Sequence, residues 1–68
     1  MRISARNQLN GTVKSVRLGT IMSEVIVDVG GQEVVAAITR ASTEGLDIKE
    51  GESIIVVIKA TDVMLARP

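Results

Sequence analysis

A run of β-branched residues in the last third of the chain limits the folds that this sequence can adopt. Ile54-Ile55-Val56-Val57-Ile58 places five such residues in succession, and their stiff χ1 angles favour a pleated sheet over a helix. Val and Ile together make up 18 of the 68 residues. The sequence therefore predicts an all-β fold.

Alternation of apolar and polar residues predicts the individual strands. The expected strands cover residues 7–18, 24–29, 33–38, 53–58 and 63–66. Gly11 marks a bend or bulge in the first of them. In the second strand Val25, Val27 and Val29 face inward, and Gly30-Gly31 supplies the hairpin turn that leads to the third strand.

The spacing of apolar residues changes from that of a strand to that of a helix between the third and fourth strands. Thr39 suits an N-cap, and Ala41 and Glu44 suit a helix of one or two turns whose end Gly45 weakens. Three strands, a short helix and two further strands follow the order of the five-stranded OB-type barrel. We expect a single domain spanning residues 1–68.

The size of the chain favours self-association. A domain of this length hides only about 60% of the surface that its unfolded chain exposes. The chain has no Cys and no His, which excludes disulfides and nearly all zinc, haem and iron–sulfur sites. The runs Ile54–Ile58 and Val34–Ile38 leave an apolar face on the outside of the sheet. We predict an obligate homo-oligomer.

The composition also excludes most catalytic chemistry. Without Cys or His there is no thiolate nucleophile and no imidazole base, and the carboxylates of Glu50 and Glu52 lie in a charged turn that we interpret as solvated surface. No Phe, Tyr or Trp is present to stack on a nucleobase or a pterin. A pI of about 6.1 disfavours general nucleic-acid binding. We expect no enzyme, no organic cofactor and no nucleic-acid partner.

The chain has no segment typical of a secreted or membrane protein. Its first residues lack the apolar region of a secretory signal, and no apolar run approaches the roughly 20 residues of a membrane helix. We expect a cytoplasmic protein that does not contact a membrane.

The zero net charge conceals a basic N-terminal third. Residues 1–22 contain four cations and no acid, namely Arg2, Arg6, Lys14 and Arg17. This asymmetry indicates either an anion site or charge pairing between subunits.

A set of hydroxyls and cations could hold a tetrahedral oxyanion. Ser4 and Arg6 project to the same side of an extended segment, Thr39 and Ser42 lie at the start of the predicted helix, and Lys59 ends a strand. Two cations would balance a charge of −2, while hydroxyl and N–H groups would donate to the oxygens.

Four segments of the chain form an ordered set of motifs, namely Ile3-Ser4-Ala5-Arg6-Asn7-Gln8-Leu9-Asn10-Gly11, Ala37-Ile38-Thr39-Arg40-Ala41-Ser42, Leu46-Asp47-Ile48-Lys49-Glu50-Gly51 and Ile58-Lys59-Ala60-Thr61-Asp62-Val63-Met64. These segments resemble the molbindins, a family of small molybdate-binding proteins. The resemblance covers nearly the whole chain. It is closest to the free-standing, single-domain form of the family.

This resemblance implies an OB-type barrel in a hexamer, arranged as a trimer of dimers, that stores molybdate or tungstate in the cytoplasm. The oxyanion would be the only bound ligand and would lie between subunits. The implied contacts are the side chains of Ser4, Arg6, Thr39, Ser42 and Lys59 and the main-chain N–H of Ala60. A second class of site would lie on a symmetry axis and use mostly main chain, for which residues 19–23 are a candidate.

Two other functions remain open at the level of sequence. One is an anion-responsive interaction or regulatory module that contacts a partner protein. The other is an oligonucleotide-binding OB domain, which the pI and the absence of aromatic residues disfavour.

Overall fold

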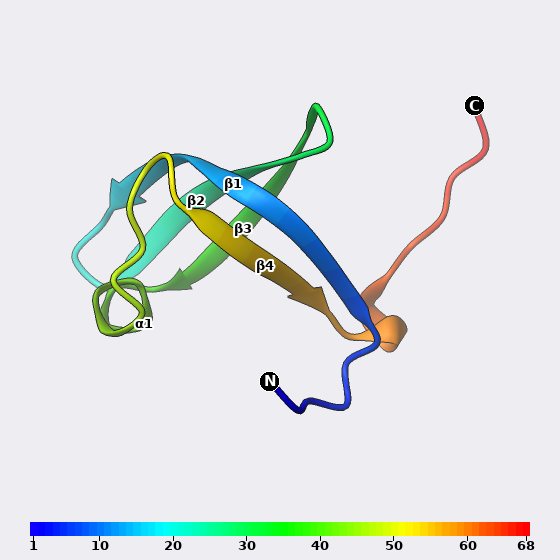
Figure 1. The fold of residues 1–68 in the computed structure, drawn as a ribbon, viewed down its shortest axis with the longest axis horizontal. Helices are drawn as coiled ribbons and strands as arrows, with labels where there is room; N and C mark the ends of the chain where they lie inside the picture. The colour runs from blue at the N-terminus through cyan, green and yellow to red at the C-terminus, as the bar shows by residue number, and fades with distance from the viewer.

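One antiparallel sheet of four strands forms the frame of the protein. The computed structural model describes residues 1–68 (Figure 1). The strands are β1 (Asn7–Leu18), β2 (Met22–Val29), β3 (Gln32–Thr39) and β4 (Ser53–Ile58), in the spatial order β3-β2-β1-β4. A short helix, α1 (Arg40–Gly45), joins β3 to β4, and a 3-10 turn, η1 (Ala60–Asp62), follows β4. The all-β, OB-like architecture with one small helix agrees with the prediction.

Local sequence explains the two connections that were predicted. Gly30 and Gly31 both adopt positive φ angles, 57° and 88°, which the tight hairpin between β2 and β3 requires. Thr39 caps α1, because its hydroxyl accepts a hydrogen bond from the N–H of Ser42. The helix has six residues, and no helix of the protein is long and apolar enough to cross a membrane.

The bulge in β1 lies at Lys14 and not at Gly11. The pairing of β1 with β2 shifts register between Val13 and Ser15. Gly11 is needed for a different reason, since a Cβ there would lie 2.6 Å from Cγ1 of Val27 and 2.7 Å from the backbone oxygen of Asp28. The glycine lets β2 pass close to β1.

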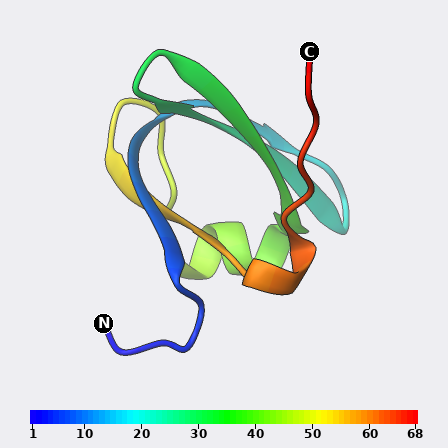
Figure 2. The ribbon, with the colours of Figure 1, turned by 90° about the vertical axis from the view of Figure 1, so that its right-hand side faces the viewer.

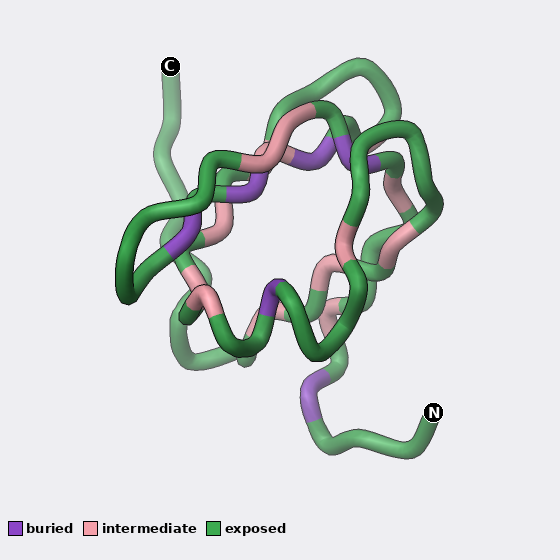
Figure 3. The backbone as a smooth tube through the Cα atoms, turned by 90° about the vertical axis from the view of Figure 1, so that its left-hand side faces the viewer, coloured by how far each residue is buried: buried purple, intermediate pink, exposed green.

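The core of a single chain is small. Only Val13, Val25 and Val27 form a fully buried apolar cluster, and Figure 3 shows how short the buried stretches of the chain are. Val25 and Val27 face inward as predicted, and Val29 is half-buried against them. A core of this size leaves much apolar surface uncovered.

The strand predicted over residues 63–66 is absent, which corrects the five-stranded barrel. After η1 the chain runs away from the sheet to the C-terminus (Figures 1 and 2). Met64 and Leu65 are 92% and 95% exposed. A strand must pair with a free edge, and η1 directs this segment away from the free edges of β3 and β4. The sheet of one chain therefore has four strands and stays open.

The outward faces of β3 and β4 are apolar, as the sequence predicted. Ile54 and Val56 point inward and are half-buried, whereas Val35, Ile55 and Val57 are 60%, 45% and 37% exposed. An apolar cavity of about 200 Å³ is lined by ten apolar residues from β2, β3, β4 and the segment after α1, namely Val25, Val27, Ala36, Ile38, Leu46, Ile48, Ile54, Ile55, Val56 and Val57. One chain thus exposes apolar surface at both free edges of its sheet.

Candidate functional site

Two of the candidate cations meet where β1 begins and β4 ends. Asn7 and Ile58 form the terminal pair of the β1–β4 ladder. Arg6 and Lys59 are therefore the next residues on the two neighbouring chain segments. Ala60 follows as the first residue of η1, and Figure 1 shows the start of β1 beside η1. The register thus places Arg6 and Lys59 one residue beyond the same terminal pair, with Ala60 after Lys59 and Ser4 on the segment that precedes Arg6.

The charges at this end of the sheet are not neutralised within the chain. The three ion pairs of the structure join Lys14 to Glu33, Arg40 to Glu44 and Lys49 to Asp47. Arg6 and Lys59 are exposed and take part in none of them. We define Ser4, Arg6, Lys59 and Ala60 as the cation end. Its two unpaired positive charges match the −2 charge of a tetrahedral oxyanion.

Lys14 shows the contrast with a neutralised cation. Its hydrogen bond to Glu33 and the charge of that carboxylate raise the pKa of Lys14 above its ordinary value. The pair spans two strands on the exposed side of the sheet. Lys14 therefore contributes to the basic N-terminal third in the sequence but not to a free anion-binding surface.

The two candidate hydroxyls meet at a second place. Oγ1 of Thr39 accepts a hydrogen bond from the N–H of Ser42 at 3.0 Å and donates to Oγ of Ser42 at 2.8 Å. Both residues are exposed. Each hydroxyl carries one hydrogen and either can donate to the other, so the pair keeps one hydroxyl hydrogen for a ligand. We define Thr39 and Ser42 as the hydroxyl end.

The cation end and the hydroxyl end lie at opposite ends of the molecule. Thr39 pairs with Met22, and the next residue of β2, Ser23, pairs with Leu18 at the end of β1. The two sets are thus separated by β1, whose 12 residues curve around the sheet. Figure 1 shows α1 and η1 far apart along the longest axis. One chain alone cannot surround a small anion with all six predicted residues.

Residues 19–23, the candidate for a second class of site, comprise the turn between β1 and β2 and the first two residues of β2. The N–H of Gly19 donates to the backbone oxygen of Met22 at 2.8 Å, and a Cβ at Gly19 would lie 2.5 Å from that oxygen. Arg40 holds the turn against α1, since its N–H donates to the oxygen of Ile21 at 2.8 Å and its Nη1 to the oxygen of Gly19 at 3.4 Å. The hydroxyl of Ser23 is buried and makes no hydrogen bond. The assignment of this turn to an anion stays a prediction.

Two amide side chains at the cation end were missed by sequence reasoning. Nδ2 of Asn7 donates to the backbone oxygen of Ile58 at 3.2 Å, and Nε2 of Gln8 donates to the backbone oxygen of Ala5 at 2.9 Å. Their position directly after Arg6 was the only sequence signal for a role beside the cations.

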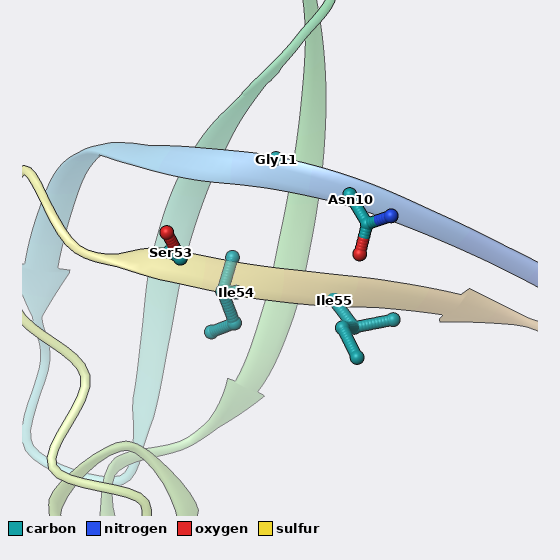
Figure 4. A pocket seen from close by; sticks show the side chains of 5 residues that line it. All are labelled: Asn10, Gly11, Ser53, Ile54 and Ile55. Carbon is teal, nitrogen blue, oxygen red and sulfur yellow. The ribbon is translucent and has the colours of Figure 1, made fainter.

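Other features of the surface do not suit a dianion. An open hollow over the ladder of β1 and β4 is lined by one amide, one hydroxyl and no cation (Figure 4). Its lining residues are Asn10, Gly11, Ser53, Ile54 and Ile55. No group of three or more Asp or Glu side chains is placed to hold a metal cation. The cation end remains the best candidate.

Comparison with known proteins gives consistent results over nearly the whole chain. Residues 3–65 match a family model described as the TOBE domain. The chain is 47% identical over 66 residues to molybdenum-pterin-binding protein 3 of Clostridium pasteurianum, which covers 96% of this chain and 97% of that protein. The relatives carry the names of binding proteins rather than of enzymes.

Solved structures show the same similarity. A molybdate-binding protein from Sporomusa ovata superposes with a TM-score of 0.94 at 40% identity, covering 98% of this chain and 100% of that one. ModG, described as a cytoplasmic molybdate-binding protein and solved with molybdate bound, gives a TM-score of 0.92 at 40% identity. The match covers 100% of this chain and 49% of the ModG chain.

Proposed function

This chain belongs to the TOBE domain family, and we propose that it binds molybdate as a cytoplasmic store of the oxyanion. The observation that carries the proposal is that two exposed cations without an ion-pair partner, Arg6 and Lys59, each lie one residue beyond the terminal pair of the β1–β4 ladder. The molybdate-binding relatives and the description of ModG as cytoplasmic support the choice of ligand and compartment. Tungstate, which is close to molybdate in size, shape and charge, would use the same contacts.

The proposed site lies between copies of the chain. The cation end supplies the charge and the main-chain N–H of Ala60, while the hydroxyl end of a neighbouring copy supplies Thr39 and Ser42. The separation of the two ends in one chain supports this arrangement. Hydrogen bonds to a charged group are roughly twice as strong as neutral ones, and burial in an interface strengthens them further.

The open sheet supports the homo-oligomer on which this site depends. The edges of β3 and β4 are unpaired, the cavity between them is apolar, and Val35, Ile55 and Val57 are exposed. Each buried Val or Ile contributes roughly 1.5–3 kcal/mol. We propose that residues 63–66 of a neighbouring copy supply the fifth strand of the barrel, within a hexamer built as a trimer of dimers.

The bound species in this proposal is the free oxyanion. The names of the Clostridium pasteurianum relatives include a pterin, but this chain has no Phe, Tyr or Trp to stack on one. Titration with molybdate and with a pterin separates the two ligands, and elemental analysis of the purified protein for Mo and W identifies the resident ion. Pterin binding without oxyanion binding contradicts the proposal.

A mixing experiment tests whether the site lies between copies. One variant carries Arg6→Ala and the other carries Ser42→Ala, which leaves the Thr39 cap in place. By titration calorimetry each variant alone should bind molybdate about tenfold more weakly or worse, the usual loss for a hydrogen bond to a charged group. After the two variants are unfolded and refolded together, a fraction of sites combines an intact cation end with an intact hydroxyl end and should regain the original affinity. A site within one chain gives no such recovery.

A further inference from the structure

Resting on the proposed function, we propose that Asn7 and Gln8 are positioning residues that set the spacing of Arg6 and Lys59 before the oxyanion arrives. Arg6 and Lys59 each lie one residue beyond the last pair of the β1–β4 ladder. Segments beyond a ladder fray unless side chains hold them, because the ladder provides no hydrogen bonds there. The two amides provide the missing bonds, one on each chain segment.

Asn7 holds the segment that carries Lys59. Its Nδ2 donates to the backbone oxygen of Ile58 at 3.2 Å, the residue directly before Lys59, and the side chain is half-buried. Lys59 itself begins the turn of η1, where its oxygen accepts from the N–H of Asp62 at 2.9 Å. The backbone of Lys59 is thus fixed on both sides.

Gln8 holds the segment that carries Arg6. Its Nε2 donates to the backbone oxygen of Ala5 at 2.9 Å, and Ala5 is the only buried residue of the first six. The bond ties the residue directly before Arg6 to β1. No backbone hydrogen bond holds residues 1–6 in its place.

The consequence is a site whose charges are already in place. A ligand that must order its own binding residues loses affinity for the entropy of doing so, and pre-ordering removes that loss. The two amides carry no charge, so their removal should weaken binding without changing the number of charges that the ligand meets. A loss of affinity in these variants can therefore be assigned to the positioning of the two cations and not to a lost charge.

The test compares Asn7→Ala and Gln8→Met with Asn10→Ala, a matched control. Asn10 carries the same amide on the same strand but makes no side-chain hydrogen bond and is exposed. Molybdate affinity is measured by titration calorimetry at several salt concentrations, with size-exclusion chromatography to confirm assembly. We expect about tenfold weaker binding for each test variant, the factor that corresponds to ordering roughly one residue, and no change for the control.

Two further measurements distinguish a positioning role from other roles. The salt dependence of binding should be unchanged in Asn7→Ala and Gln8→Met but reduced in Arg6→Ala, which loses a charge. In the ligand-free protein, the heteronuclear ¹⁵N NOE of the Arg6 amide should fall in Gln8→Met, and that of Lys59 in Asn7→Ala. If Asn7→Ala does not assemble, Gln8→Met still tests the proposal, because Gln8 is exposed and its replacement should leave the assembly intact.

The possible outcomes separate this inference from the proposed function. Wild-type protein that binds no molybdate contradicts the proposed function, and the NOE measurement still decides whether the amides order the cations. Wild-type protein that binds, together with variants of unchanged affinity and unchanged NOE, overturns the positioning role.

Discussion

Adding one methyl group at Gly11 should destabilise the protein. A Cβ there would lie 2.6 Å from Cγ1 of Val27 and 2.7 Å from the backbone oxygen of Asp28. Carbon atoms pack best at about 3.5–4.0 Å, so β1 and β2 would have to separate by about 1 Å. The oxygen of Asp28 cannot rotate away, because Asp28 pairs with Thr12 in the ladder.

The magnitude follows from two opposing effects. Overpacking in a well-packed interior costs about 1–3 kcal/mol, whereas replacing glycine by alanine restricts the unfolded chain and stabilises by about 0.4–1 kcal/mol. The expected net loss in the free energy of unfolding of Gly11→Ala is about 1–2 kcal/mol. A protein of this length has a total stability of roughly 3–10 kcal/mol, so the loss is a substantial part of it.

Urea unfolding followed by circular dichroism measures this loss, with all proteins at one concentration because association and stability are linked. Gly45→Ala is the control. A Cβ at Gly45 meets nothing within 4 Å, and alanine favours a helix, so this variant should be at least as stable as the wild type. A Gly11→Ala protein as stable as the wild type would refute the argument that the close approach of β2 requires glycine.

Three further outcomes are expected. Lys59→Ala should weaken molybdate binding about tenfold or more in calorimetry while size-exclusion chromatography shows an intact assembly, and unchanged affinity would remove Lys59 from the site. Deleting residues 63–68 should shift the protein to smaller species in size-exclusion chromatography, and an unchanged elution volume would exclude an exchanged fifth strand. Glu33→Gln should reduce stability at neutral pH, because Glu33 raises the pKa of Lys14. That contribution is complete below the ordinary lysine pKa and is lost as the pH rises through the raised value. The difference in the free energy of unfolding between the two proteins should therefore disappear at strongly alkaline pH, and a difference that persists there contradicts the pair.

Local sequence signals were enough to predict most of the fold. The bounds of β1 and β4 follow from alternation and from the β-branched run. The hairpin at Gly30 and the cap at Thr39 follow from residue types that act within a few positions. The missing fifth strand shows the limit of such signals, because a strand also needs a partner edge, and η1 directs residues 63–66 away from both edges of their own chain.

The candidate site depends on the same limit, because residue types name its members but the pairing of the strands decides where they lie. Residue types identified Arg6 and Lys59 as cations, and the register of β1 with β4 places them side by side. Sequence could not show that Thr39 and Ser42 lie at the other end of the sheet, since their position depends on how the strands are paired. The roles of Asn7 and Gln8 were invisible because an amide in a strand has no preferred function until its hydrogen-bond partner is known.

In the proposed site between copies, the placement of the cation end and the hydroxyl end at opposite ends of one chain implies a stoichiometry. Each copy supplies one cation end and one hydroxyl end, and every complete site uses one of each. In a closed, symmetric assembly none is left over, and this class of site should hold one oxyanion per chain whatever the number of copies. An open chain of copies would leave one incomplete site at each end. The number of oxyanions bound per chain would therefore show whether the assembly is closed.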